Sequence, residues 1–181
     1  MHKEVVLLDI LHARDRRLNE RSQHFCYDNI FLITLMLNIP GNEKTNEKYI
    51  KVFKEGMFLL KKRLDSLGVK TVEVKENHYN TGSEGVFIVS NEDLDQNSLI
   101  TIKKELVKLE ETHYIGRLLD YDLYINMEKQ ISRKDIPLES RRCFVCNKKA
   151  KDCSRSRRHN IEEILEVIDK SIENYCFNGK H

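Results

Sequence analysis

The stretch "GRLLDYDLYI", residues 116–125, alternates apolar and polar side chains in the way that a half-buried strand does. Its polar positions hold two carboxylates, Asp120 and Asp122. Aspartate is depleted in strands because its side chain competes for local backbone hydrogen bonds and is costly to remove from water. Side chains two residues apart share a face of a strand, so both carboxylates should project together, roughly 6 to 7 Å apart. The intervening apolar side chains should face the core.

A divalent cation would explain why the two carboxylates stand so close. Mg²⁺ is usually held by one or two carboxylates with water and substrate phosphates, whereas without a cation the pair would repel and one group would tend to protonate. Arg117 precedes the pair and Arg133 follows it. Acidic metal ligands among arginines suit phosphoryl or nucleotidyl transfer, because guanidinium groups offset charge on the leaving group. The alternative is a solvated strand face whose carboxylates form only salt bridges.

Apolar periodicity predicts the elements before this stretch. A charged amphipathic helix is expected over residues 3–26, and a buried strand within residues 29–39 that stops at a Pro-Gly turn. Thr45 should cap a long helix, which should end at Gly68 because glycine suits the left-handed backbone found there. The first part of the chain is therefore expected to be helix, strand, helix.

Two further strands and one helix are predicted in the rest of the core. Strands are expected over residues 69–74 and 86–89, with a loop over residues 77–85 between them, and then a helix over residues 97–111. The segment 129–134 should pair with the Asp-x-Asp strand as a hairpin. After the first helix the order is β-α-β-β-α-β, which predicts an α+β fold of the ferredoxin-like type, an antiparallel sheet with two helices on one face.

Length and charge narrow the class of protein. A chain of 181 residues is expected to form a single domain, with the α+β core at 28–135, a Cys/His knuckle at 141–160 and a C-terminal helix at 161–177. The formal net charge of +2 argues against general coating of nucleic acid. No apolar run is long enough to span a bilayer and no signal-peptide cleavage site precedes the core, so a cytoplasmic protein that does not enter membranes is expected.

Three cysteines and a histidine follow the core at the spacing Cys143-x2-Cys146-x6-Cys153-x5-His159. Two cysteines separated by two residues form a knuckle that grips one edge of a tetrahedral Zn²⁺. The segment around them is almost entirely polar, so little besides a metal would order it. A structural zinc site is the favoured interpretation, and free thiols in a basic loop are the alternative.

Basic side chains near these motifs are candidates for phosphate binding. Arg14 and Arg17 belong to the first predicted helix, and Arg142 directly precedes the cysteines. Lys44 stands at a strand-to-helix turn, where backbone amides also favour phosphate. As a set these side chains could bind a polyphosphate or an acidic protein. The simpler alternative for each of them is a solvated surface charge.

Read together, these segments resemble the citrate lyase holo-acyl-carrier-protein synthases, also called apo-citrate lyase phosphoribosyl-dephospho-CoA transferases. The resemblance is collinear from Leu8 to about Leu165 and includes the spaced Cys153 and His159. It rests on the motifs "HARDRR", "IPGNEK", "TGSEG", "LEETHYIGRLLDYDLYI" and "ISRKDIPLESRRCFVC". The combination of Gly-Arg-x-x-Asp-x-Asp with Arg-Arg-Cys-x-x-Cys is specific.

The resemblance implies a nucleotidyl-type transferase that modifies a protein. Its substrate would be 2'-(5''-triphosphoribosyl)-3'-dephospho-CoA, and the phosphoribosyl-dephospho-CoA part would be attached as a prosthetic group to a serine of the apo acyl-carrier subunit of citrate lyase. Diphosphate would leave.

The resemblance also implies roles for residues of this chain. Asp120 and Asp122 would hold Mg²⁺ against the α-phosphate, and Arg117 would act beside them as the third catalytic residue. The remaining substrate-binding residues would be Arg14, Arg17, Lys44, Arg133 and Arg142. The zinc held by the cysteines and His159 would be structural.

Two other functions remain open at this point. The transferase that primes malonate decarboxylase performs the same chemistry on a different carrier, although the Cys-x-x-Cys with its downstream cysteine and histidine favours citrate lyase. The cysteine segment and the arginines could instead form a zinc-dependent nucleic-acid-binding module. The charge balance and the lack of aromatic residues near the basic clusters speak against that module, because single-strand binders need stacking platforms.

Overall fold

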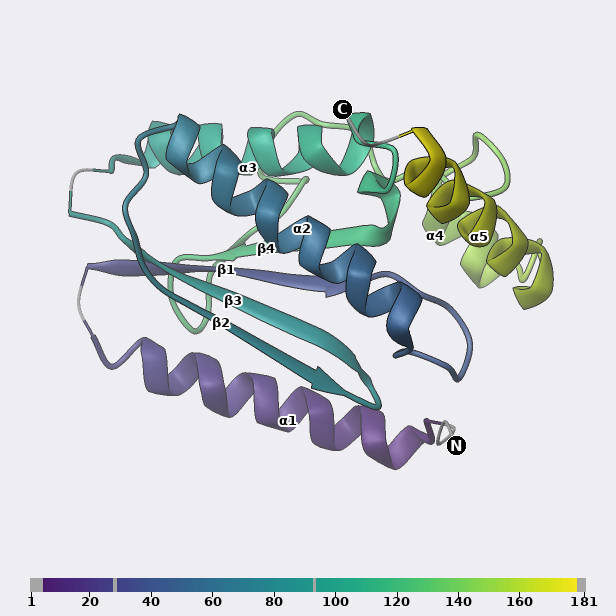
Figure 1. Ribbon diagram of the computed structural model, residues 1–181. Coiled ribbons are helices and arrows are strands. Elements are labelled where there is room, and N and C mark those ends of the chain that lie inside the picture. Colours follow the sequence, from purple (N-terminus) through teal and green to yellow (C-terminus); the bar gives the residue numbers. More distant parts are fainter. Residues whose placement is uncertain (1–4, 28, 93, 179–181) are drawn as a thin grey trace.

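The structure is a computed structural model that describes residues 5–27, 29–92 and 94–178 (Figure 1). Its helices and strands are, in chain order, α1 (Leu7–His24), β1 (Ile30–Leu37), α2 (Glu47–Ser66), β2 (Thr71–Tyr79), β3 (Gly82–Ser90), α3 (Gln96–Thr112), the 3₁₀ turn η1 (Gly116–Leu118), β4 (Leu119–Tyr124), β5 (Gln130–Ile131), α4 (Ala150–Arg155) and α5 (Ile161–Asn178).

The five strands form one antiparallel sheet in the order β2-β3-β1-β4-β5. Helices α2 and α3 cover one face, α1 crosses the opposite face, and α4 and α5 lie at one end (Figure 1). Placing β1 between β3 and β4 is the pairing expected of a ferredoxin-like β-α-β-β-α-β chain. The α+β class, the order of the elements and the hairpin of β4 with β5 are confirmed.

The main core lies between the sheet and the pair α2 and α3. Alternate residues of β1 and β4 point into it, among them Phe31, Ile33 and Tyr121, each fully buried. The opposite face has a much smaller apolar cluster built on Leu32 and Ile88. Because so little apolar surface lies beneath α1, polar side chains can occupy the rest of that face.

The loop predicted over residues 77–85 is wrong. β2 continues to Tyr79 and β3 begins at Gly82, so only residues 80 and 81 form the turn. Gly82 has a φ of +120°, a backbone conformation that glycine adopts without steric cost and that allows the chain to reverse within this short span. The polar residues of this run belong to the two strands, and His78 of β2 forms a hydrogen bond with its partner Ser83 of β3 at 2.8 Å.

The predicted cap of α2 is also corrected. Asn46 is the capping residue, and its side-chain oxygen accepts a hydrogen bond from the Tyr49 amide at 2.8 Å. The hydroxyl of Thr45 donates instead to the carbonyl of Tyr79, at the end of β2. At the other end of α2, Gly68 has the left-handed backbone that was predicted, with a φ of +68°.

A close approach at Gly116 holds the start of β4 against the end of α3. A Cβ atom at this position would lie 2.2 Å from the carbonyl oxygen of Leu109 and 2.8 Å from that of Glu110. Only glycine therefore fits here. The contact brings the last turn of α3 within hydrogen-bonding reach of the β4 backbone.

We expect Gly116→Ala to lower the free energy of unfolding by about 3 kcal/mol, the upper end of overpacking costs, because the obstacle is backbone that cannot rotate away. Gly68→Ala is the matched control, since a Cβ there meets nothing within 4 Å. The control should cost about 1 kcal/mol for its left-handed backbone alone. Urea unfolding measures both values, and equal losses in the two variants would contradict the close approach.

Candidate active site and metal centre

The two aspartates of β4 lie on the face of the sheet that α1 crosses. Burial alternates along β4, with its apolar side chains enclosed and Asp120 and Asp122 partly exposed, as predicted. Each carboxylate has one oxygen engaged: Oδ1 of Asp120 accepts from Arg141 at 2.7 Å, and Oδ1 of Asp122 accepts from Gln130. The second oxygen of each has no hydrogen-bond partner among the described residues, and it remains available to a ligand.

The electrostatics of this pair favour an added cation. Burial, followed by the charge of the neighbouring Asp120, raises the pKa of Asp122 to about 6. Lys103 and Arg141 act in the opposite direction but do not cancel these effects. Two carboxylate oxygens on one face are hard donors of the kind that Mg²⁺ prefers, so the residues present fit such an ion.

A buried carboxylate on α3, Glu110, organises the edge of the sheet beside this pair. It is 3% exposed and accepts a hydrogen bond from the Tyr121 amide at 2.9 Å. It also forms ion pairs with Arg133 at 2.5 Å and Arg141 at 2.7 Å. Arg141 therefore bridges Glu110 to Asp120, and Arg133 is held by Glu110 and its neighbour Glu111.

The sequence analysis did not select Glu110 or Arg141 as site residues, although both lie within the motifs quoted for the resemblance. Glu110 stands four residues after the buried Leu106, on the apolar stripe of α3. A carboxylate at a core-facing helix position is a signal that could have been noticed, because a buried charge requires partners. Nothing local identifies those partners, since they come from a distant segment of the chain.

A cleft of about 670 Å³, called the α1 cleft below, lies between α1 and the sheet. Arg14 and Arg17 line it from α1, Asp122 from β4 and Glu84 from β3. The structure thus brings together three of the residues proposed from the sequence, on elements far apart in the chain. Among the described residues, no hydrogen bond or ion pair engages the guanidinium of Arg14, which leaves it available to an anion.

Glu84 is a second missed residue of this cleft. Its side chain is 5% exposed, and Oε1 accepts from Arg16 and Arg17, each at 2.8 Å. Its other oxygen, Oε2, is buried and has no partner among the described residues. The signal was its place in "TGSEG", two residues before Val86 on the same strand face. The prediction of a loop over residues 77–85 left this pattern of alternate residues in β3 out of the sequence analysis.

The remaining proposed residues lie elsewhere. Arg117, Arg133 and Arg142 line a second cavity, at the sheet edge beside residues 138–150. Lys44 lines neither cavity, and its ammonium group donates to the carbonyl of Ile39. Burial lowers the pKa of Lys44. The proposed phosphate-binding residues therefore lie in three places, which are the α1 cleft, the cavity at the sheet edge and, for Lys44, a position beside Ile39.

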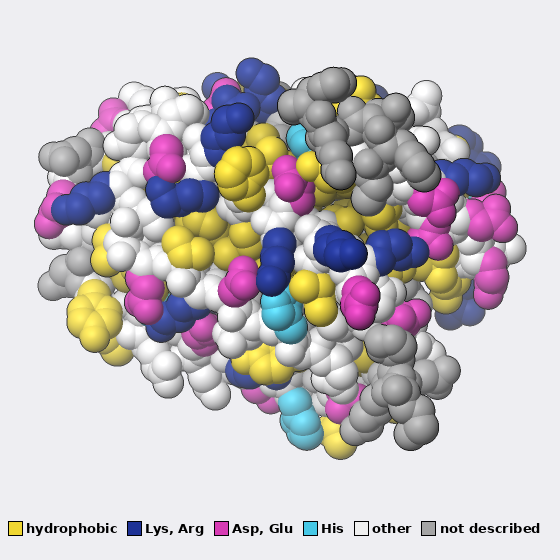
Figure 2. Space-filling view, viewed as in Figure 1, with side chains coloured by type: hydrophobic (Ala, Val, Ile, Leu, Met, Phe, Trp, Pro, Cys, Tyr) yellow, Lys and Arg dark blue, Asp and Glu magenta, His cyan; other side chains and the backbone are white. Residues whose placement is uncertain are grey.

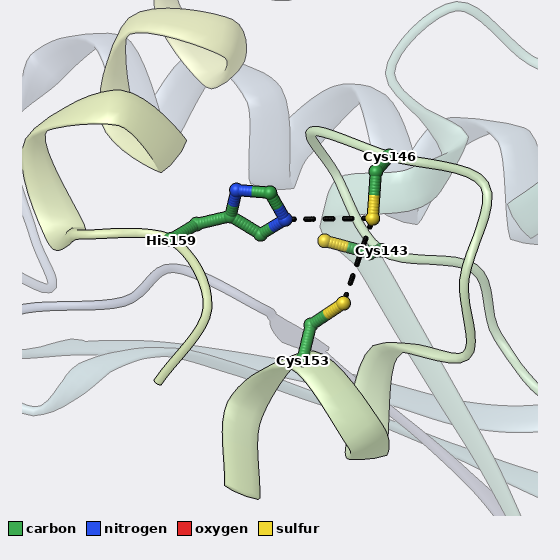
Figure 3. Close-up of side chains that lie close together, drawn as sticks. All are labelled: Cys143, Cys146, Cys153 and His159. Carbon is green, nitrogen blue, oxygen red and sulfur yellow. Dashed lines mark hydrogen bonds between the residues drawn. The ribbon is translucent and has the colours of Figure 1, made fainter. Parts of the chain in front are cut away.

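The cysteine segment forms a compact set of metal-ligand atoms. Cys143 and Cys146 come from a loop, Cys153 from α4 and His159 from the turn before α5, and all four side chains converge (Figure 3). One ligand atom from each lies within 4.8 Å of the others. Three sulfurs and one imidazole nitrogen so placed could hold a metal ion.

The protonation of these ligands fits metal binding. Hydrogen bonds from the Lys148 amide and His159 lower the pKa of Cys146 to about 6, so its thiolate is readily available. Burial raises the pKa of Cys153 to about 11, which a bound cation would reverse. On the imidazole of His159, Nε2 lies 3.4 Å from the Cys146 sulfur and Nδ1 lies 3.3 Å from Glu163, which orients the ring.

The knuckle is tied to the sheet edge by two arginines. The guanidinium of Arg117, from η1, donates to the carbonyls of Arg142, at 3.0 Å, and Cys143. The carbonyl of Arg141 accepts from the Ala150 amide at 2.8 Å, within the same loop. The metal-ligand loop therefore sets the position from which Arg141 reaches Asp120.

Surface charge is mixed on the face shown in Figure 2, where lysine and arginine side chains are interspersed with aspartate and glutamate. A nucleic-acid site would need a surface dominated by basic groups. That face does not provide one. Among the described residues, no helix has the length and apolar character needed to cross a bilayer.

Comparison with known proteins gives a consistent match. The family model described as CitX, apo-citrate lyase phosphoribosyl-dephospho-CoA transferase, matches residues 5–175. A probable apo-citrate lyase phosphoribosyl-dephospho-CoA transferase of Vibrio cholerae is 28% identical over 171 residues, covering 94% of this chain and 93% of the relative. One of Streptococcus pyogenes is 30% identical over 177 residues, covering 94% and 87%. Protein CitXG of Leuconostoc mesenteroides is 28% identical over 174 residues, which are 93% of this chain and 35% of the relative.

We expect Glu110→Gln to lower the free energy of unfolding by about 2 to 3 kcal/mol, because it removes the charge that satisfies two arginines at the sheet edge. Glu111→Gln is the matched control, since Glu111 also pairs with Arg133 but has an exposed side chain. An exposed pair contributes about 0 to 1 kcal/mol. Chemical unfolding compares the variants, and a loss in Glu110→Gln no larger than in the control would refute its organising role.

Proposed function

The chain belongs to the apo-citrate lyase phosphoribosyl-dephospho-CoA transferase family, and we propose that its reaction takes place in the cleft between α1 and β4. The donor is 2'-(5''-triphosphoribosyl)-3'-dephospho-CoA, and the acceptor is a serine of the apo acyl-carrier subunit of citrate lyase. The observation that supports this location is the meeting of Asp122 with Arg14 and Arg17 in one cleft. No observation favours the malonate decarboxylase carrier or a nucleic acid.

The bonds that change are at the α-phosphate. The serine oxygen bonds to this phosphorus, the bond from phosphorus to the oxygen that bridges the α- and β-phosphates breaks, and that oxygen leaves with the electron pair as part of diphosphate. The serine proton passes to solvent or to a base. Stabilising the charge that develops on the phosphates is the chief catalytic requirement of such transfers.

The side chains of the cleft suit this requirement. Asp120 and Asp122 would hold Mg²⁺ through the oxygens left free by Arg141 and Gln130, and the ion would offset charge on the reacting phosphates. Arg14 has no ionic partner among the described residues and is placed to pair with the leaving diphosphate. Arg17 is held by Glu84, which presents its guanidinium to the same cleft.

Arg117 acts through the knuckle in this proposal. Its guanidinium is occupied by backbone carbonyls of residues 142 and 143, so it positions that loop and thereby Arg141. Arg141 in turn orients Asp120. We assign Arg117 a positioning role in place of the direct contact with phosphate that the resemblance implied.

Zinc is the metal that suits the knuckle. Three cysteine sulfurs with one imidazole nitrogen form a common structural zinc set, and no fifth ligand is needed. The four cysteines whose side chains the structure describes, Cys26 and the three of the ligand set, carry no disulfide, which agrees with the cytoplasm as the compartment.

Asp120→Asn and Asp122→Asn should each slow transfer at least about 100-fold, because loss of a metal ligand removes several kcal/mol of charge stabilisation. Intact-mass spectrometry of the apo carrier, incubated with enzyme, Mg²⁺ and donor, measures the gain of one prosthetic group. Asp135→Asn is the control, since Asp135 only accepts from Ser132 in a local turn outside both cavities. Wild-type rates in both cleft variants would refute the assignment.

The purified protein should contain one zinc ion per chain, measured by elemental mass spectrometry. Cys146→Ser should lose the metal and lower the melting temperature by at least about 5 °C, because binding of a structural zinc contributes several kcal/mol to folding. Cys26→Ser is the matched control, as Cys26 is exposed and outside the ligand set. A metal-free wild-type protein, prepared without chelator, would contradict the zinc site.

A further inference from the structure

The second cavity, at the sheet edge, has no role in the reaction described so far. Its volume is about 510 Å³, within the range of pockets that bind nucleotides and other drug-sized ligands. Residues of η1, the end of α3 and the segment 138–150 line it. It therefore combines rigid elements with the loop that leads into the knuckle.

The charge of this cavity is largely neutralised. Each of its four arginines already has a carboxylate or backbone carbonyl partner: Arg117, Arg133, Arg141 and Arg142. Such a site is poorly suited to a triphosphate, which needs unpaired cations. The α1 cleft, with the unpaired Arg14 and the two aspartates nearby, suits the triphosphate better.

The walls of the cavity suit an aromatic ring. Phe144 is half-buried, and the guanidinium carbon of Arg117 lies 5.1 Å from its ring centroid. Leu138 and Ala150 add apolar surface. Asn38 and Asn147 also line the cavity, and among the described residues no hydrogen bond engages the side-chain amide of either one. A flat base could stack on the phenyl ring while an amide reads its polar edge.

The two cavities are linked through the Asp-x-Asp pair of β4. Arg141 lines the second cavity and donates to Asp120 at 2.7 Å, and Asp122, two residues further along β4, lines the α1 cleft. A ligand with a base in one cavity and a triphosphate in the other would therefore extend past Arg141 toward the carboxylates. The donor of the proposed reaction has this form, since sugars join its adenine to the triphosphate.

We propose that the second cavity binds the adenosine portion of the donor, with the adenine stacked on Phe144, while the triphosphate lies in the α1 cleft. This assignment rests on the proposed function. It explains how the enzyme binds one large substrate although its arginines lie in two cavities. The paired arginines shape the nucleotide site, and Arg14, which has no ionic partner among the described residues, meets phosphate.

Calorimetric titration of the full chain with separate parts of the donor tests this division. The probes are dephospho-CoA, AMP and inorganic triphosphate with Mg²⁺. Phe144→Leu keeps the apolar volume but removes the stacking face. It should weaken the binding of dephospho-CoA and of AMP about tenfold, the usual effect of losing one base–aromatic stack. Its affinity for triphosphate should stay within twofold of wild type. Arg14→Ala should show the reverse pattern.

Ala150→Leu fills the cavity from α4 and should also weaken the binding of dephospho-CoA and of AMP. This second variant guards against a misleading result from a single substitution. Unchanged dephospho-CoA affinity in both cavity variants would overturn the assignment. Weaker binding of dephospho-CoA with unchanged binding of AMP would also overturn the assignment, because the cavity would then hold the pantetheine arm. If the subsite fails while wild-type enzyme still modifies the carrier, the proposed function stands; if wild type modifies no carrier, the function itself fails.

Discussion

The buried carboxylate of Glu110 is the group on which the architecture of the site depends. A charge with 3% exposure is tolerated only with close partners, and this one has the Tyr121 amide, Arg133 and Arg141. Through these contacts it joins α3 to the exposed edge of β4 and to the loop before the knuckle. Gly116 makes the arrangement possible by letting α3 and β4 approach closely.

The positions of Asp120 and Asp122 on β4 therefore depend on packing on both faces of the sheet. Packing of the apolar residues of β4 against α2 and α3 directs Asp120 and Asp122 to the opposite face. On that face α1 contributes arginines, held in part by Glu84. At the edge, the metal-ligand loop contributes Arg141. A metal in the knuckle would affect the site indirectly, by fixing the position of Arg141 and thereby of Asp120.

Features with local causes could be predicted from the sequence. Alternation in β4 placed the aspartates on one face, and the spacing of Cys143, Cys146, Cys153 and His159 predicted a set of ligands that the fold does bring together. The partners of Glu84 and Glu110 could not be identified from the sequence. The two arginines that pair with Glu84 are 67 and 68 residues away, and those that pair with Glu110 come from a later segment of the chain. The division of the arginines between two cavities likewise depends on how helices dock, which residue spacing does not encode.

The proposed site places the reacting phosphates between β4 and α1. Its most direct test is a crystal structure of the protein with Mn²⁺ in place of Mg²⁺ and with diphosphate, in which anomalous scattering locates the metal. The expected result is an anomalous peak bound by Asp120 and Asp122, with diphosphate in the α1 cleft beside Arg14. Metal and diphosphate together in the second cavity, or metal at the knuckle alone, would contradict it.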